Sequence, residues 1–284
     1  NTAVGADALL LNTTGAYNVA VGTLALDAST TADSNTAIGY TSLGANTTGQ
    51  YNTAVGSAAL GTNTTADNNT AIGRNALLVN TTGAGNVAIG ALALDANTTA
   101  ANNTAVGLSA LSANTTGTEN VAFGQVALTQ STTGNYNTGL GRAALYGNTT
   151  ASNNTAVGYN SLLSNTTGAE NVSVGSTSLD ANTTGGYNTA LGANSLGANT
   201  TADHNVAVGR DALLANTTGA KNVSVGSNST ASNTTGSNNV AIGYDALGDN
   251  TTASNNTVVG YAALSVNTTG AENVAIGWEA NKGR

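Results

Sequence analysis

Seventeen glycines divide this sequence into equal steps. They are Gly5, Gly22, Gly39, Gly56, Gly73, Gly90, Gly107, Gly124, Gly141, Gly158, Gly175, Gly192, Gly209, Gly226, Gly243, Gly260 and Gly277, and every interval is 17 residues. Apart from Phe123 and Val258, each closes a segment that reads Asn, Thr or Val, a small residue, an aliphatic residue and Gly, from NTAVG at 1–5 to NVAIG at 273–277. Repetition at one fixed period is typical of stacked coils, so the sequence predicts an elongated repeat array rather than a globular domain.

The rest of the repeat is nearly as regular. When each repeat is counted from its glycine as position 0, positions 3 and 4 read Ala or Ser followed by Leu, and positions 7 to 9 read Asn-Thr-Thr. Both threonines recur in all sixteen complete repeats, and position 13 is always Asn. One repeat is weaker than the others, because Thr230 replaces the leucine at position 4.

The period disfavours a helix and favours strands. Seventeen residues make about 4.7 helical turns, so an apolar stripe would wander from one repeat to the next. Short β-branched runs bounded by Gly and Asn are typical of strands. A coil with two short strands and two turns needs about this many residues, and successive coils pair in parallel about 4.8 Å apart. The sequence therefore predicts an all-β fold, a parallel β-solenoid of 17 coils.

The charged residues indicate which parts of a coil are covered. Within the complete repeats, every Asp, Glu, Lys and Arg lies at position 1, 2, 5, 6, 11 or 12. Positions 13 to 16 carry no charged residue. Position 14 is Thr or Val, position 15 is mostly Ala, and position 16 is mostly Val or Ile, so neither face of that strand has the polar side chains of a solvated face. One face can fill the coil interior. The other needs a cover, and the simplest cover is another copy of the chain.

A comparison of magnitudes also favours association between copies. Each coil offers about one Val or Ile, one Leu and two or three Ala, and burial of a large aliphatic side chain contributes only about 1.5–3 kcal/mol. Ordering the backbone costs about 1–2 kcal/mol per residue. We therefore expect an obligate homo-oligomer.

Composition narrows the class of partner. The net charge is −8, and the six basic residues are scattered singly, which disfavours nucleic acid or an anionic membrane as a partner. There is no cysteine, and no apolar run approaches the length of a membrane span, so we expect no membrane insertion. The chain begins and ends within a repeat. We expect residues 1–284 to form one array that belongs to a longer chain.

The NTAVG, NTAIG and NVAIG segments resemble the head repeats of trimeric autotransporter adhesins of the YadA-like type, and similar repeats occur in phage tail-fibre-like proteins. The resemblance extends over essentially the whole chain. It implies a left-handed parallel β-roll in which three chains pack around a common axis. It also implies an extracellular or cell-surface location and attachment to host matrix, cells or glycans. The repeats here have 17 residues where the family has about fourteen, and no neck, coiled-coil stalk or membrane anchor is present in this sequence.

Catalysis, metals and cofactors find no support in the sequence. His204 is the only histidine, and beside Asp203 it is expected to be a solvated surface residue. No nucleophile motif, paired-carboxylate constellation or phosphate-binding loop is present. Calcium-binding solenoids place an aspartate in every turn, and no acidic residue recurs at one position in consecutive coils here. The sequence predicts no enzyme activity and no cofactor.

The Asn-Thr-Thr segment has three interpretations. Stacked Asn and Thr side chains can hydrogen-bond along the array and cap the turns. A regular threonine array can order water, as in ice-binding solenoids, although adjacent threonines in a strand point in opposite directions. Asn-Thr-Thr is also a glycosylation sequon, with candidate acceptors Asn12, Asn46, Asn63 and Asn80. Coils about 4.8 Å apart leave too little room for a sugar on each, so any glycosylation is expected to be sparse.

Aromatic side chains are the candidate contact residues. They lie at positions 1 and 12, where charge is also permitted, and exposed aromatics are good anchors for a partner. The candidates are Tyr17, Tyr40, Tyr51, Tyr159, Tyr187, Tyr244, Tyr261 and Trp278. Packing in a turn or at a seam between subunits is the alternative role for them.

These observations favour a structural and adhesive rod that presents a repetitive surface outside the cell. A self-assembling extracellular filament subunit is the second hypothesis, and an ice- or surface-binding solenoid is the third. In each case the strand is expected to build the array, and the variable turns are expected to carry any recognition.

Overall fold

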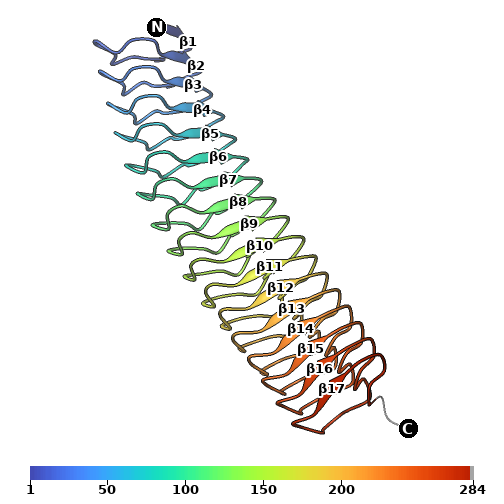
Figure 1. The fold of residues 1–284 in the computed structure, drawn as a ribbon. Helices are drawn as coiled ribbons and strands as arrows, with labels where there is room; N and C mark the ends of the chain where they lie inside the picture. The colour runs from blue at the N-terminus through green and yellow to red at the C-terminus, as the bar shows by residue number, and fades with distance from the viewer. Residues whose placement is uncertain (282–284) are drawn as a thin grey trace. The chain divides into compact units, whose positions relative to one another are not determined.

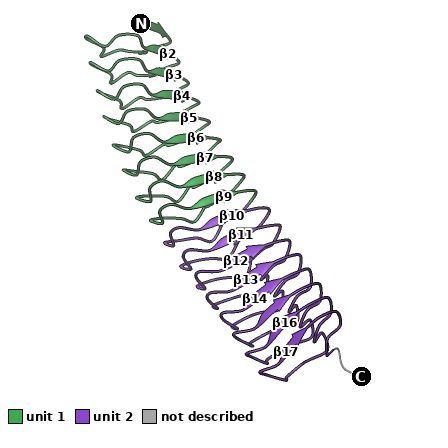
Figure 2. Ribbon diagram, viewed as in Figure 1, with its two compact units in different colours: residues 1–142 green, residues 143–284 purple. Residues whose placement is uncertain are grey.

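The computed structural model describes residues 1–281, in which the chain folds as a parallel β-solenoid with seventeen strands and no helix. Its residues form two compact units, Asn1–Arg142 and Ala143–Arg284 (Figure 2). In each unit every strand lies beside the equivalent strand of the next coil (Figure 1). The predicted all-β solenoid is confirmed.

All strands are three residues long and pair in parallel at an offset of 17 residues, for example Thr53 with Thr70. Unit 1 contains β1 (Thr2–Val4), β2 (Val19–Val21), β3 (Thr36–Ile38), β4 (Thr53–Val55), β5 (Thr70–Ile72), β6 (Val87–Ile89), β7 (Thr104–Val106), β8 (Val121–Phe123) and β9 (Thr138–Leu140). Unit 2 contains β10 (Thr155–Val157), β11 (Val172–Val174), β12 (Thr189–Leu191), β13 (Val206–Val208), β14 (Val223–Val225), β15 (Val240–Ile242), β16 (Thr257–Val259) and β17 (Val274–Ile276).

The expectation of two strands per coil was wrong. Positions 1 to 6 form a turn segment, because the residues at positions 2 and 4 have positive φ and the backbone cannot stay extended. In one coil these residues are Ala58, with φ of 57°, and Leu60, with φ of 51°. The conformation directs the N–H groups of positions 2 and 4 to opposite neighbouring coils, while the N–H of Ala59 between them donates to Gly56 in the same coil. Ala58 donates to the carbonyl of Tyr40 in the preceding coil, and Leu60 donates to that of Ala76 in the following coil.

The coil interior is narrow and filled by small side chains and one leucine. Leucine at position 4 is fully buried in most coils, as Leu60 and Leu196 are, and the alanines at positions 3 and 15 pack beside it. The strand contributes only its middle residue, such as Ala54, to this core. The valine or isoleucine at position 16 points outward, as the residue at position 14 does.

The glycine at position 0 joins the strand to the turn segment in a conformation that other residues adopt at high cost. Gly56 has φ of +132°, and a Cβ there would lie 2.6 Å from the carbonyl oxygen of Gly73 in the next coil. The same contact recurs at position 0 in successive coils, so the regular glycine spacing reflects close backbone approach between coils.

Two columns of buried asparagines hold the coils together. At position 13, Asn69 accepts the backbone N–H of Asn86 at 2.9 Å and donates to the carbonyl of Gly83 at 3.0 Å. At position 7, Asn63 donates to the side-chain oxygen of Asn46 at 2.9 Å and to the carbonyl of Ala66 at 3.0 Å. These amides have no access to solvent, and their hydrogen bonds satisfy polar groups that water cannot reach.

The threonine at position 8 adds a third set of bonds, since its hydroxyl donates to the carbonyl of the equivalent residue one coil on, as from Thr47 to Thr64 at 3.0 Å. The prediction that Asn and Thr side chains hydrogen-bond along the array and close the turns is therefore confirmed. The threonine's acceptor is a backbone carbonyl of the next coil.

Serine interrupts the position 7 column at Ser29. Among the described residues, Ser29 Oγ and the Oδ1 atom of Asn12 in the preceding coil are buried without a hydrogen-bond partner. An unpaired buried polar atom costs about 1–3 kcal/mol. We expect Ser29→Asn to raise the free energy of unfolding by about that amount, because the new amide would donate to Asn12 and accept from Asn46.

Thermal unfolding followed by circular dichroism measures this change. The control is Ser34→Asn at half-buried Ser34 in position 12, where Asn already occurs in other coils, and it should leave the unfolding midpoint unchanged. An equal midpoint for wild type and Ser29→Asn would contradict the assigned cost of the interruption.

Candidate functional site

The strands present an uncovered apolar surface, which we call the outer strand face. It consists of positions 14 and 16 of the coils, because the middle residue of each strand points inward and its two neighbours point outward. The large exposed side chains on it are Val4, Ile38, Ile72, Ile89, Val121, Phe123 and Leu140 in unit 1, and Val172, Leu191, Ile242, Val274 and Ile276 in unit 2. No charged residue lies on this face, and nothing else in the described chain covers these side chains.

The predicted contact aromatics are all exposed, but they do not form one patch. Exposure ranges from 41% for Tyr261 to 82% for Tyr17. Tyr40, Tyr159, Tyr244, Tyr261 and Trp278 lie at position 1, and Tyr17, Tyr51 and Tyr187 lie at position 12. The prediction had omitted Tyr136, which is also exposed at position 12.

Three of these rings form a stack at position 1 of successive coils. The ring centroids of Tyr244 and Tyr261 are 5.3 Å apart, and those of Tyr261 and Trp278 are 4.3 Å apart, with nearly parallel planes. The rings therefore cover one another's faces, and the middle ring offers mainly its edge to solvent. A sugar that binds an aromatic residue packs on the ring face, so the stack favours stabilisation between coils over a sugar platform.

Burial limits which sequons the folded chain can present. The side chains of Asn46, Asn63 and Asn80 are fully buried in the position 7 column, and only Asn12 is half-buried. Glycosylation stays a prediction, and a glycan on any of the three buried amides would have to be attached before the coils close.

The paired threonines lie at an outward edge of the coil. The position 9 threonines, such as Thr48 and Thr82, are exposed, and those at position 8 are half-buried. This segment is a bend between buried positions 7 and 10 and not a strand, so the rule that adjacent strand residues point in opposite directions does not apply to it. Both columns of threonines therefore contact solvent.

A notch lies in the turn segments of unit 2, and the sequence had not indicated it. Its volume is about 400 Å³, and it is lined by Thr177, Asp180, Asn194, Gly197, Ala198 and Leu214. Asp180, Gly197 and Leu214 occupy position 5 in three consecutive coils, so the missing side chain of Gly197 opens a gap between a carboxylate and a leucine. The signal in the sequence that could have indicated this notch is the succession of an aspartate, a glycine and a leucine at position 5 of three consecutive repeats.

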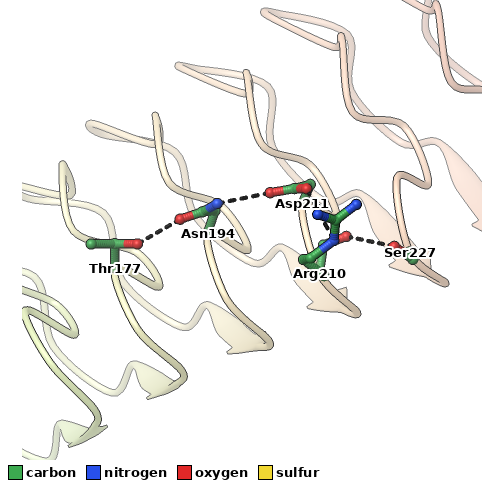
Figure 3. Close-up of polar contacts among 5 residues, drawn as sticks. All are labelled: Thr177, Asn194, Arg210, Asp211 and Ser227. Atoms are coloured by element: carbon green, nitrogen blue, oxygen red, sulfur yellow. Dashed lines mark hydrogen bonds and ion pairs between the residues drawn. The ribbon is translucent and has the colours of Figure 1, made fainter.

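A string of polar contacts continues from one rim of this notch (Figure 3). Thr177 Oγ1 donates to Asn194 Oδ1 at 2.5 Å, and Asn194 Nδ2 donates to Asp211 Oδ1 at 2.9 Å. Arg210 Nε lies 3.4 Å from Asp211 Oδ2, and Ser227 Oγ donates to the carbonyl of Arg210 at 3.3 Å. Each contact joins adjacent turn segments or adjacent residues, so the string fixes the side chains on that rim.

Burial sets the acid–base behaviour of two aspartates at position 5. Partial desolvation raises the pKa of Asp180 above its usual value, against the lowering effect of hydrogen bonds from the backbone at Asp180 and Ala181. Desolvation likewise raises the pKa of Asp95, against a hydrogen bond from its own backbone. The fold therefore favours the protonated form of each carboxyl group, so the contribution of each group to the stability of the folded chain is greatest at low pH. That contribution is lost as pH rises from the ordinary value through the raised one.

The only histidine of the sequence, His204, takes part in an aromatic contact. The ring of His204 stacks on Tyr187, with centroids 4.9 Å apart. Within residues 1–281, no three His, Cys, Asp or Glu side chains are grouped so that they could hold a metal ion. No helix in that part of the chain is long and apolar enough to cross a membrane.

Comparison with protein-family models finds none that matches the chain, and a search of curated proteins finds no match either. The resemblance to trimeric autotransporter heads accordingly stays an expectation, and the parallel β-solenoid is the level at which the fold is established.

Proposed function

We propose that this chain is a non-enzymatic structural and adhesive solenoid at the cell surface or outside the cell. Copies of the chain pack through their outer strand faces. The turns, which carry the charged and aromatic residues, remain free for attachment to matrix, cells or glycans.

The outer strand face is the observation that carries this proposal. It is uncharged and contains aliphatic or aromatic side chains in coil after coil of each unit, of which Ile72 is 39% exposed and Phe123 is 52% exposed. Contiguous apolar surface of this kind marks an interaction site, whereas single exposed apolar residues are ordinary. In a thin coil whose core holds one leucine and a few alanines, burial of this face would add substantially to stability.

A second copy of the same chain is the partner that fits this face best. Its positions 14 and 16 recur with the same strand spacing of about 4.8 Å, so ridges and gaps stay in register coil after coil. A globular partner would match only a few coils. Three-fold packing around a common axis is the arrangement that the resemblance to adhesin heads implies.

We expect the purified chain to be an oligomer that three charges on the outer strand face convert into a monomer. The variant combines Ile38→Asp, Ile72→Asp and Ile89→Asp, because buried unpaired carboxylates would oppose association by several kcal/mol. Sedimentation velocity and native mass spectrometry report the number of chains per particle.

A matched variant controls for added charge. It carries Thr48→Asp, Thr82→Asp and Thr116→Asp at exposed position 9, and it should keep the oligomeric state of the wild type. A wild-type chain that is monomeric at micromolar concentration would contradict the proposal. Electron microscopy of the native particle separates discrete oligomers from continuous fibres, which would indicate the filament hypothesis.

Attachment is tested separately from assembly. The wild type is applied to arrays of immobilised matrix proteins and glycans, and the monomeric triple variant is applied to the same arrays. Several parallel chains bind with avidity, so the variant is expected to lose about 100-fold or more in apparent affinity for any surface that retains the wild type. Retention on none of these surfaces would contradict the adhesive role but not the assembly.

The exposed threonine edge supports ice binding as a second candidate. Both threonine columns contact solvent, and the bonds of the position 8 hydroxyls hold that column in a regular array. Thermal hysteresis in a solution of the chain, lost in the position 9 aspartate variant, would favour this function.

A further inference from the structure

The notch beside Gly197 has the form of a small binding site on one chain. The Asp180 carboxylate stands on one side and the Leu214 side chain on the other, since a Cβ on Gly197 would lie 3.6 Å from Asp180 Oδ1 and 3.3 Å from Leu214 Cδ1. The space that this Cβ would occupy is thus already bounded by a negative group and an apolar group. A ligand that fills it must satisfy both.

The polar atoms around the notch favour a donor as ligand. The hydrogen of Thr177 Oγ1 is directed to Asn194 Oδ1 or to the carbonyl of Ser176, and Asn194 uses Nδ2 to bind Asp211. The backbone carbonyl oxygen of Asn194 lies 3.2 Å from the place that a Cβ on Gly197 would occupy. Acceptors therefore predominate on the rim, and a ligand that can only accept hydrogen bonds would be poorly matched.

The charge of Asp180 is not balanced within the described residues. Arg210 pairs with Asp211, and no cationic side chain in residues 1–281 pairs with Asp180. Partial burial of this carboxylate without a counter-ion is unfavourable, in keeping with the raised pKa of Asp180. An arriving cation would relieve that cost, and the chain's net charge of −8 would attract it.

We propose that the Gly197 notch binds a lysine side chain of a partner protein. The ammonium group pairs with Asp180 and donates to the rim acceptors, while the four-carbon stem packs on Leu214. A stem of this kind buries its methylene groups along apolar surface and leaves the charge at its tip, which matches the two sides of the notch. The site lies on a single chain, so the inference goes beyond the proposed assembly and does not require it.

The chain itself supplies a close control for this site. Asp95 lies at the same repeat position as Asp180, follows a leucine in the preceding coil, and is also partly desolvated. One coil after Asp95, however, position 5 is Ser112, whereas one coil after Asp180 it is Gly197. The serine side chain therefore fills the gap beside Asp95. Asp27 is followed by Gly44, but Gly61 comes next in place of a leucine, so the apolar wall is missing there. We therefore expect one lysine site per chain.

The test uses a fluorescein-labelled peptide Gly-Ser-Lys-Ser-Gly and fluorescence anisotropy at low ionic strength. The lysine peptide is expected to bind the full chain, whereas the same peptide with norleucine in place of lysine is not. Asp180→Asn removes the counter-charge. Gly197→Ala fills the gap with a methyl group, and the array already accommodates alanine at position 5, as Ala231. Each should weaken binding about tenfold or more, because a hydrogen-bonded charge pair is lost or blocked.

Asp95→Asn should leave the affinity unchanged, although it removes the same charge. Equal losses in Asp95→Asn and Asp180→Asn would show attraction by net charge alone and would overturn the site. Binding of the norleucine peptide, or no binding of the lysine peptide, would overturn it too. Thermal unfolding of each variant verifies folding. If Gly197→Ala proves unstable, the comparison of the two asparagine variants decides the question.

Discussion

Replacing Gly56 with alanine is expected to lower the free energy of unfolding by at least about 3 kcal/mol. Gly56 has φ of +132°, which side chains other than glycine adopt with strain. The added Cβ would also lie 2.6 Å from the Gly73 carbonyl oxygen and 2.7 Å from its carbonyl carbon. Those atoms belong to the backbone of the next coil and cannot move aside without breaking the strand ladder.

Thermal and urea unfolding of the variant measure this loss. Gly61→Ala is the matched control, because Gly61 lies at position 5 with no positive φ, and Ala231 occupies the equivalent position in another coil. Its free energy of unfolding should stay within about 0.5 kcal/mol of that of the wild type. Equal stability of Gly56→Ala and wild type would show that successive coils can separate at this point.

Replacing Asn69 with alanine is expected to lower the free energy of unfolding by about 2–6 kcal/mol. The substitution leaves the backbone N–H of Asn86 and the carbonyl of Gly83 without the bonds that the Asn69 side chain makes, at a place that has no access to water. Each orphaned buried group costs about 1–3 kcal/mol. Hydrogen exchange should show faster opening at Asn86 than at amides several coils away.

The neighbouring residue supplies the control for this variant. Asn68 lies at position 12 and faces solvent. The control changes it to serine, which occurs at the same position in another coil as Ser34. Asn68→Ser should therefore alter stability by no more than about 0.5 kcal/mol. A loss of stability in Asn68→Ser equal to that in Asn69→Ala would mean that the buried column is not the cause.

The sequence was sufficient to predict the solenoid, because one period governs every chemical type in the repeat. It also predicted the buried leucines, such as Leu60, and the hydrogen bonds along the Asn-Thr-Thr segment. It failed for the second strand, since leucine rarely adopts the positive φ that Leu60 has. Stacking on both neighbouring coils imposes that conformation, and no local preference of the residue reveals it.

The candidate site could be predicted only in part. Exposure of the aromatics follows from their sharing positions with charged residues, but the stack of Tyr244, Tyr261 and Trp278 depends on ring orientation. The Gly197 notch depends on three residues separated by 17 positions each and on a side chain that is missing. A residue-by-residue scan detects functional groups that are present, so a gap in a column becomes visible only when the coils are superimposed.

The asparagine columns also determine how the length of such a chain can change. Each buried amide forms a hydrogen bond to the equivalent residue in the coil before or after it. Insertion of a single residue would therefore displace both columns and leave their polar atoms unpaired. Insertion or deletion of a whole 17-residue segment would restore every bond, because one coil offers the same donors and acceptors as another. The gain or loss of complete coils is thus the change in length that leaves these hydrogen bonds intact.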